Sequence, residues 1–108
     1  MVKVRRIATT YILQHLSDPD LSVQKIAQAL GIGSRQLQRA FVEAGETPSQ
    51  LIMAKRLDEA ARELVRLRNL TILEVAFSLG FNDASHFSQS FARRFGVSPR
   101  LYRQKALD

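Results

Sequence analysis

The sequence predicts an all-α fold, and three observations support this prediction. The 108 residues include only three Pro and five Gly, which stand at the ends of periodic apolar segments and not inside them. Within the segments, apolar residues recur at the spacing of one helix face. Two segments also follow capping boxes, in which a Thr precedes a Gln or Glu by three residues. These signals together indicate seven helices and no convincing strand.

Two helices are predicted before residue 32. The first ends ahead of Asp18-Pro19, because the residue before a proline is disfavoured in the α region. Its apolar residues recur at helical spacing and are Val4, Ile7, Ala8, Tyr11, Ile12 and Leu16. Ser22 is placed to cap the second helix, which runs to Leu30 and ends at Gly31.

A short helix and a long helix follow. The short helix is expected from about Ser34 to Ala44. Its inward-facing residues are Leu37, Ala40 and Phe41. Thr47-Pro48-Ser49-Gln50 combines a capping box with Pro at the first helical position and therefore begins a long helix to about Arg68. We expect Asp58 and Arg62, four residues apart on this helix, to form an exposed ion pair.

Three further helices are predicted in the last third of the chain. Thr71-Ile72-Leu73-Glu74 is the second capping box, and it begins a helix that Gly80 ends. Asp83 is placed to cap the next helix, which Gly96 ends. Ser98-Pro99 begins a last short helix, which continues through Tyr102 and Arg103.

The chain contains an internal duplication. Residues 21–32 resemble residues 70–81, which lie 49 positions later. The matching positions are Leu21, Val23, Ile26, Ala27, Leu30, Gly31 and Ile32 against Leu70, Ile72, Val75, Ala76, Leu79, Gly80 and Phe81. Phe41 and Phe91 match at an offset of 50, and Pro48 and Pro99 at 51. Each copy is a short helix, a Gly-containing turn and a second helix, which is a helix-turn-helix.

The predicted architecture is therefore two helix-turn-helix subdomains joined by a long linker helix, in the homeodomain-like manner. The expected boundaries are residues 1–47, 48–68 and 69–108. An ordinary pair of helical hairpins without a role on DNA is the alternative, because a fold alone does not determine function.

The charge of the chain points to an anionic partner. Sixteen Lys and Arg against ten Asp and Glu give a formal net charge of +6. The absence of Cys excludes disulfides, a thiol nucleophile and thiolate metal sites, and it suits a reducing cytoplasm. We expect no signal peptide and no membrane span, because the apolar run from Ile7 to Leu16 is interrupted by polar residues.

The outward faces of the two second helices carry candidate DNA-binding side chains. Those expected to read base edges are Arg35, Gln38 and Arg39 in the first copy and Ser85, Ser88 and Gln89 in the second. Those expected to contact phosphates are Ser34, Thr71, Arg93 and Arg94. The second set of readers is shorter and uncharged, so it is expected to depend more on DNA shape and methyl contacts. A solvated helix surface is the alternative for each of these side chains.

The predicted long helix has a length that suits double-stranded DNA. A helix of roughly twenty residues, at about 1.5 Å per residue, spans about 30 Å. Successive major grooves on one face of B-DNA lie roughly 34 Å apart. The helix is therefore expected to hold two readers on neighbouring grooves, although it would equally serve to pack the two halves together.

Other functional classes receive less support from the sequence. Asp83, Ser85 and His86 do not form a hydrolase triad, because neighbouring helix residues point in different directions and Asp83 is explained as a cap. His15 and His86 lack ligand partners at metal-binding spacing, so we expect no enzyme, no cofactor and no metal. A basic helical RNA-binding module or a protein adaptor is the remaining alternative, but exposed aromatic residues for base stacking are not evident.

Residues 21–103 resemble the C-terminal DNA-binding region of AraC/XylS-family transcription regulators. The matching residues of the second copy are Ile72, Val75-Ala76, Gly80-Phe81, Asp83, Ser85, Phe87, Phe91, Phe95-Gly96, Ser98-Pro99 and Tyr102-Arg103. Those of the first copy and the linker are Leu37, Arg39, Phe41, Gly45, Pro48, Arg56-Leu57 and Ala60. At Gly33 the family usually has a capping Ser, so the cap there is expected to be weaker or to shift to Ser34. Gln89 and Ala92 replace positions that are commonly basic.

The resemblance implies a seven-helix fold whose third and sixth helices enter adjacent major grooves of an asymmetric operator. It implies transcription activation, with RNA polymerase as a further partner, in the bacterial cytoplasm and at the nucleoid when bound. The chain is expected to bind as a monomer. Because many members carry a sensing or dimerisation domain before this region, we expect the chain to be part of a longer regulator, and a naturally short, ligand-free regulator is the alternative.

Overall fold

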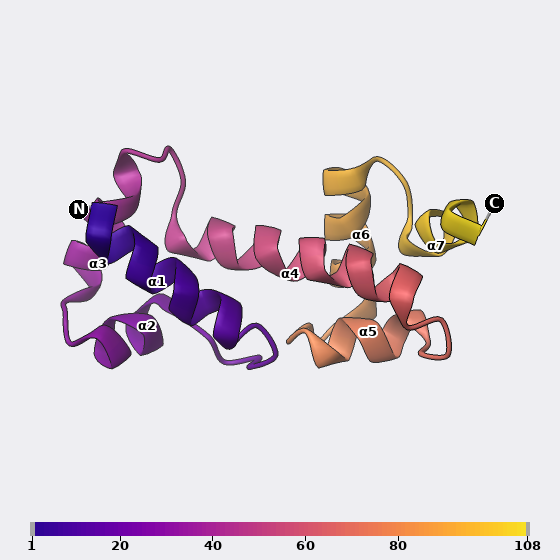
Figure 1. The fold of residues 1–108 in the computed structure, drawn as a ribbon, viewed down its shortest axis with the longest axis horizontal. Helices are drawn as coiled ribbons and strands as arrows, with labels where there is room; N and C mark the ends of the chain where they lie inside the picture. Colours follow the sequence, from indigo (N-terminus) through magenta and orange to yellow (C-terminus); the bar gives the residue numbers. More distant parts are fainter. Residues whose placement is uncertain (1, 108) are drawn as a thin grey trace. The chain divides into compact units, whose positions relative to one another are not determined.

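The computed structural model describes residues 2–107, which form seven helices and no strand (Figure 1). The helices are α1 (Val2–Gln14), α2 (Val23–Leu30), α3 (Ser34–Val42), α4 (Pro48–Arg66), α5 (Ile72–Ser78), α6 (Ala84–Phe95) and α7 (Pro99–Leu107). The predicted all-α class is confirmed. Within residues 2–107, no helix has both the length and the apolar character that a membrane crossing requires.

The helices form two compact units that divide inside α4, between Lys55 and Arg56. The N-terminal unit contains α1, α2, α3 and the first part of α4, and the C-terminal unit contains the rest of α4 with α5, α6 and α7. Pro48 and Pro99 are both buried at the start of the last helix of their unit. Each unit therefore has four helical segments, and α4 supplies one to each. The role of residues 48–68 as a linker stays a prediction.

Each unit turns between its second and third helices through the same backbone arrangement. Gly31 (φ 72°) and Gly80 (φ 86°) adopt the left-handed conformation, which costs a glycine little. After these turns, the Ile32 N–H donates to the Ala27 carbonyl at 3.0 Å, and the Phe81 N–H donates to the Ala76 carbonyl at 3.1 Å. The duplication seen in the sequence is thus a duplication of hydrogen bonding.

The core of the N-terminal unit is aliphatic apart from one aromatic ring, that of Phe41. Its buried side chains are Ala8, Ile12, Leu16, Leu21, Ile26, Ala27, Leu37, Ala40, Phe41, Leu51 and Ile52. They come from α1, α2, α3, the start of α4 and the segment joining α1 to α2. Burial of these apolar faces holds the outward face of α3 in a fixed direction.

The core of the C-terminal unit is built around aromatic rings of α6. Phe87 and Phe91 are 1% and 0% exposed, whereas Phe77 of α5 is 50% exposed, so the expectation that no aromatic residue is exposed is wrong. The ring centroids of Phe81 and Phe87 lie 4.9 Å apart in an edge-to-face arrangement, and those of Phe91 and Tyr102 lie 5.3 Å apart. Such contacts add to the stabilisation from apolar burial and hold α6 against α7.

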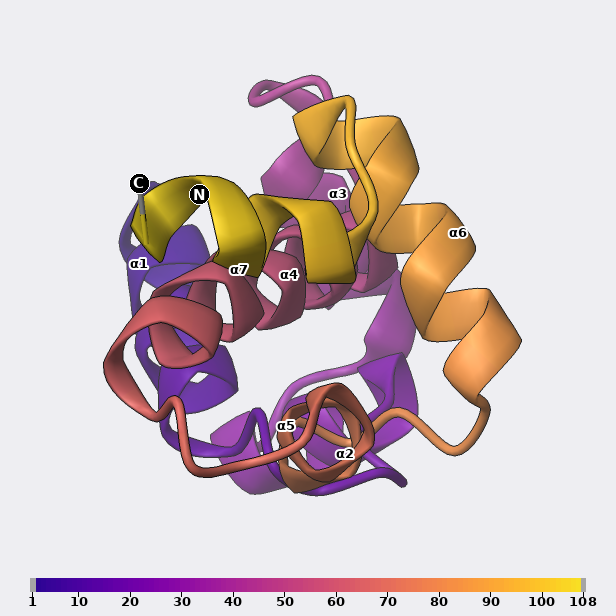
Figure 2. The same cartoon turned by 90° about the vertical axis from the view of Figure 1, so that its right-hand side faces the viewer.

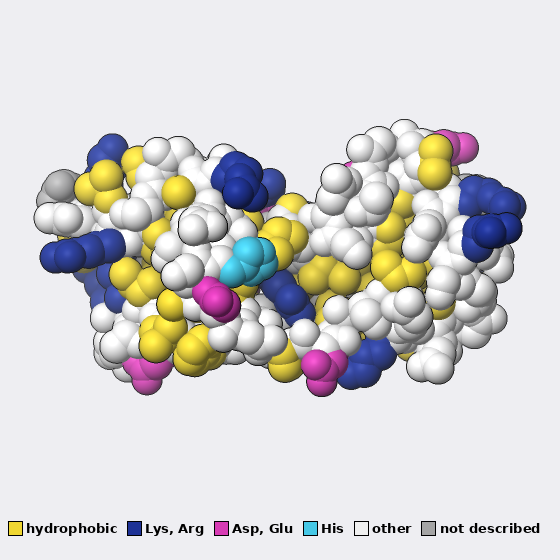
Figure 3. All heavy atoms as spheres, turned by 180° about the vertical axis from the view of Figure 1, so that it is seen from behind, with side chains coloured by type: hydrophobic (Ala, Val, Ile, Leu, Met, Phe, Trp, Pro, Cys, Tyr) yellow, Lys and Arg dark blue, Asp and Glu magenta, His cyan; other side chains and the backbone are white. Residues whose placement is uncertain are grey.

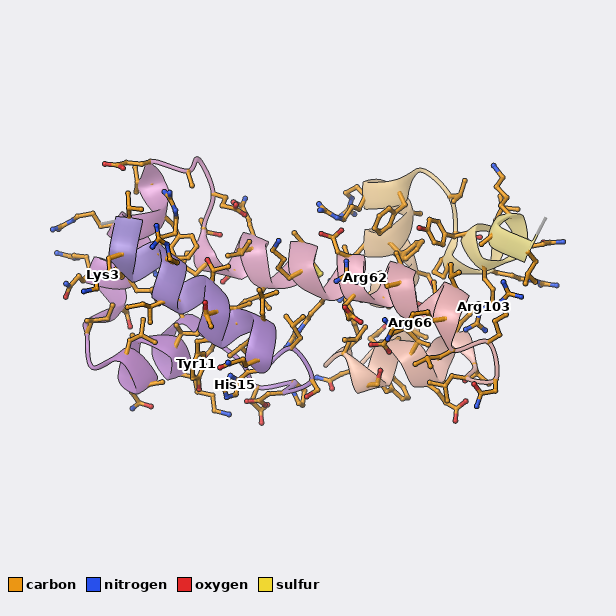
Figure 4. All side chains as sticks on the ribbon, in the orientation of Figure 1. Lys3, Tyr11, His15, Arg62, Arg66 and Arg103 are labelled. Atoms are coloured by element: carbon orange, nitrogen blue, oxygen red, sulfur yellow. The ribbon has the colours of Figure 1, made fainter. Side chains whose placement is uncertain are left out.

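The side chain of Arg103 joins α7 to the end of α4. Its Nε donates to the Leu64 carbonyl at 2.8 Å, and a terminal nitrogen donates to the Leu67 carbonyl at 3.3 Å. Figure 2 shows α7 lying across the end of α4, and Figure 4 shows Arg103 beside this end. Because the last carbonyls of a helix have no partner within it, the guanidinium satisfies the Leu64 carbonyl in the last turn of α4.

Local capping follows the predictions. Thr47 and Gln50 bond reciprocally at 2.9 and 3.1 Å, and Thr71 and Glu74 bond in the same way. Ser22 caps α2. The end of three helices differs from the prediction. The third ends at Val42 instead of Ala44, the fourth ends at Arg66 instead of Arg68, and the last extends past the predicted Arg103 to Leu107.

The expected Asp58–Arg62 ion pair is wrong. Arg62 instead bonds to Glu59, three residues away, at 2.7 Å. Asp58 accepts two hydrogen bonds from Arg94 of α6, at 2.8 and 3.1 Å. A forked bond from a guanidinium satisfies both carboxylate oxygens, and residues three apart share a helix face as well as residues four apart.

The two glycines around the first turn should respond in opposite ways to serine. Gly33 is the N-cap of α3 with φ −78° and makes no side-chain capping bond. Nothing lies within 4 Å of a Cβ at Gly33 or Gly31. We expect Gly33→Ser to stabilise the chain by about 0.5 to 1 kcal/mol, because it adds a cap and restricts the unfolded chain. Gly31→Ser, the control, should cost about 1 kcal/mol because of its positive φ.

Urea unfolding of both variants measures these changes. Equal destabilisation by the two substitutions would contradict the assignment of Gly33 as an unsatisfied cap.

Candidate nucleic-acid interface

The outward face of α3 is polar and basic. Arg35, Gln38 and Arg39 are exposed, and Ser34 is half-buried at the start of the helix. The opposite face is buried in the core of the N-terminal unit. Among the described residues, no carboxylate pairs with Arg35 or Arg39. These guanidinium groups therefore remain available for an external anion or a base edge.

The cap of α3 depends on the residue before Ser34. Gly33 occupies the N-cap position, and Ser34 is the first helical residue. The weaker cap expected from the sequence is confirmed, whereas a shift of the cap to Ser34 is not observed. The first N–H groups of α3 consequently lack a side-chain acceptor from Gly33.

The outward face of α6 is uncharged. Ser85 and Gln89 are exposed, and Ser88 is half-buried. Asp83 caps the helix by accepting a bond from the His86 backbone N–H at 2.8 Å. Figure 3 shows the face of the molecule seen from behind, on which Lys and Arg side chains form several separate clusters among uncharged side chains. The two second helices thus present different chemistry on equivalent faces.

Thr71 is the N-cap residue of α5, and its backbone and its side chain both form hydrogen bonds of the capping box. Its N–H donates to the Glu74 carboxylate at 2.8 Å, and its hydroxyl oxygen accepts from the Glu74 N–H at 3.0 Å. The backbone hydrogen bond holds the pKa of Glu74 below its ordinary value. The hydroxyl hydrogen of Thr71 can still be donated to a phosphate oxygen, because a hydroxyl both donates and accepts.

The two arginines at the end of α6 differ in their surroundings. Arg93 is exposed. Arg94 is bound to Asp58, and its guanidinium carbon lies 5.9 Å from the centre of the Phe95 ring. The charge of Arg94 is therefore largely compensated within the C-terminal unit, while none of the described carboxylates pairs with Arg93.

Lys25 is a further basic side chain near the first turn, and it is already engaged. Its Nζ lies 2.7 Å from Asp18 Oδ2. This hydrogen bond raises the pKa of Lys25. The interaction fixes the segment before α2 and makes Lys25 a weaker candidate for a phosphate contact than Arg35 or Arg39.

Sequence reasoning missed an apolar cleft between α5 and α6. It has a volume of about 310 Å³. Its lining residues are Ile72, Leu73, Ala76, Ala84, Phe87 and Ser88. A signal for it was present in the duplication, because exposed Leu73 corresponds to a polar residue, Gln24, in the first copy.

The residues considered for catalysis and metal binding have other surroundings. The Asp83 carboxylate serves as the cap of α6. The Nδ1–H of His15 donates to the Tyr11 carbonyl at 2.7 Å, and the His15 ring stacks on that of Tyr11. In the part of the chain that the structure describes, no group of three or more His, Cys, Asp or Glu side chains is placed to hold a metal ion.

Comparisons with known proteins agree with this geometry. A family model described as a helix-turn-helix domain matches residues 26–105. The transcriptional activator NphR of Rhodococcus sp. is 36% identical over 105 residues, a match that covers 97% of this chain and 30% of NphR. The chain thus spans less than a third of the length of this relative.

Two solved structures share the fold. An AraC-type transcriptional regulator from Chromobacterium violaceum superposes with a TM-score of 0.89 at 28% identity, covering 96% of this chain and 92% of that one. The DNA-binding domain of AdpA, solved in complex with a target DNA, gives a TM-score of 0.82 at 26% identity, covering 93% and 89%. The chain belongs to the AraC family of helix-turn-helix DNA-binding domains of transcription regulators.

Proposed function

We propose that this chain recognises an asymmetric double-stranded DNA site by placing α3 and α6 in adjacent major grooves. The observation that carries the proposal is the pair of helix-turn-helix units with unlike outward faces. A site read by two unlike helices of one chain has no two-fold symmetry. A single chain would then suffice for binding, without the dimer that a single helix-turn-helix commonly needs.

The two faces suit different kinds of recognition. Arg35 and Arg39 of α3 can each donate a forked pair of bonds to guanine, and Gln38 can pair with adenine. Ser85, Ser88 and Gln89 of α6 offer shorter, neutral groups. Ser34, Thr71 and Arg93 are proposed to contact phosphates, which position the protein without reading sequence. Arg94 is a weaker phosphate ligand because Asp58 already binds it.

The length of α4 supports the use of neighbouring grooves. Its 19 residues, at a rise of about 1.5 Å each, extend over about 28 Å. This length is comparable with the roughly 34 Å between successive major grooves on one face of B-DNA. We propose that α4 sets the spacing between the two readers.

The biological role proposed here is transcription activation by recruiting RNA polymerase to the promoter, in the bacterial cytoplasm and at the nucleoid. Its support is that relatives such as NphR are named activators. The net charge of +6 supports attraction to DNA in general, and it does not distinguish one operator from another.

Loss of Arg39 should reduce sequence discrimination. A preferred duplex is first selected from a random pool, and binding is measured by fluorescence anisotropy. We expect Arg39→Ala to lose about 1 to 3 kcal/mol on this duplex and much less on its scrambled version, because a forked bond to guanine is lost. Arg6→Ala removes the same charge from the exposed surface of α1 and is the matched control.

The same assay includes single-stranded DNA and RNA of the same sequence. Tighter binding to either would refute duplex recognition and favour the RNA-binding alternative. Equal losses by Arg39→Ala on the selected and scrambled duplexes would make Arg39 a phosphate ligand.

The two arginines of α6 should differ in their salt dependence. We expect Arg93→Ala to reduce the slope of log affinity against log salt by about 1, since one phosphate contact is removed. Arg94→Ala should reduce it less, because Asp58 already compensates the charge of Arg94. Titrations at several salt concentrations measure both slopes. A larger change for Arg94→Ala would reverse the assignment.

Breaking α4 between the units should weaken binding to the complete site. We expect Lys55→Pro to cost about 3 kcal/mol of helix stability, because proline removes a hydrogen bond and clashes with the preceding turn. Affinity for the complete duplex should fall, while affinity for either half-site should stay near that of the wild type. Lys55→Ala removes the same charge and keeps the helix. Unchanged affinity of a folded Lys55→Pro variant for the complete site would contradict the spacing role.

A further inference from the structure

The apolar cleft between α5 and α6 has a composition that suits one base. Five of its six lining residues are apolar, and the sixth, Ser88, contributes a hydroxyl. Leu73 is 44% exposed at the rim, and Ala84 is exposed. The cleft is therefore an open apolar surface with a single hydrogen-bonding group.

The floor of the cleft is held by the core of the C-terminal unit. Ala76 and Phe87 are 0% and 1% exposed. The Phe87 ring packs against Phe81 at 4.9 Å and against Phe91 at 5.7 Å, measured between ring centroids. Because these rings are packed on several sides, the floor offers a fixed surface to an incoming group.

The apolar rim is not required by the fold. In the duplication, the apolar residues Leu73 and Ala84 correspond to the polar residues Gln24 and Ser34, whereas Ser88 corresponds to Gln38 and is polar in both copies. Both units form the same helix-turn-helix, so this fold accepts polar side chains at the positions of Leu73 and Ala84. The apolar character of the second copy therefore calls for another explanation, and an apolar ligand group provides one.

The position of the cleft identifies this group, given the proposed function on which the inference rests. Ala84 and Ser88 lie one turn apart on α6 and continue the face formed by Ser85 and Gln89. This face is the one proposed to enter the major groove. Base edges there offer one apolar group among the four bases, the C5 methyl of thymine, and beside it the O4 acceptor.

We propose that the cleft receives the C5 methyl of one thymine, and that the Ser88 hydroxyl donates to O4 of this base. The five apolar side chains of the cleft suit the thymine methyl group, and the Ser88 hydroxyl suits the neighbouring O4 acceptor. Leu73 of α5 thus becomes a specificity residue, although it lies outside the recognition helix.

Uracil substitution tests this proposal directly, because uracil differs from thymine only by the methyl group. The probe is the duplex selected from a random pool, with each thymine replaced by uracil one position at a time. We expect one position at which the substitution weakens binding about fourfold, which corresponds to the ~0.8 kcal/mol of one buried carbon group. Replacement elsewhere should change affinity by less.

Substitutions of Leu73 and Ala84 test whether the preference for thymine over uracil arises at the cleft. Leu73→Gln and Ala84→Ser introduce the residues of the first copy, and each should reduce the preference for thymine over uracil toward one. Phe77→Gln is the matched control, since Phe77 is 50% exposed on the same helix, corresponds to Gln28 and does not line the cleft. It should keep the fourfold preference. Thermal unfolding of each variant verifies that it is folded.

Two results would overturn the proposal. One is a chain that prefers the selected duplex over its scrambled version but binds every uracil-substituted duplex equally well. The other is a preference for thymine that survives in folded Leu73→Gln and Ala84→Ser. A chain with no preference for the selected duplex would instead refute the proposed function, and the methyl site with it.

Discussion

The arrangement of each unit depends on a tight turn between two closely packed helices. This turn joins α2 to α3 in the N-terminal unit and α5 to α6 in the C-terminal unit. At each reversal a glycine adopts positive φ, and the residue after it returns a hydrogen bond to the carbonyl of a small buried alanine. A larger side chain in place of Ala27 or Ala76 would push the two helices apart, because both alanines are almost completely buried. The direction of α3 and α6, and hence everything that their outward faces can contact, follows from this packing.

Because the two units divide inside α4, this one helix contributes to the core of both units. Its first turns complete the core of the N-terminal unit through Leu51 and Ile52, and its later turns form the core of the C-terminal unit. Both ends are fixed by side chains, with Thr47 and Gln50 at the start and Arg103 at the end. A helix capped at both ends resists fraying, which is the usual weak point of helix termini.

The sequence predicted the features that depend on neighbouring residues. Capping by Thr71 and Asp83, and the turn at Gly31, involve residues within four or five positions, so a single segment contains the whole signal. The bonds of Arg94 to Asp58 and of Arg103 to Leu64 join residues 36 and 39 positions apart. Such partners are set by tertiary packing, which periodicity does not encode. The polar faces of α3 and α6 follow from the periodicity of single helices, whereas the cleft between α5 and α6 appears in the sequence only when the two copies are compared.

The two capping boxes are alike in geometry but differ in chemistry. The box of α4 uses the neutral amide of Gln50, whereas the box of α5 uses the carboxylate of Glu74, whose pKa is held below its ordinary value by the Thr71 N–H. The stabilisation from this carboxylate is complete above its ordinary pKa and is lost as the pH falls through the lower pKa of the folded state. Acidification consequently loosens the start of α5 and leaves the start of α4 intact. Protonation of a single carboxylate thus acts on only one of the two capping boxes.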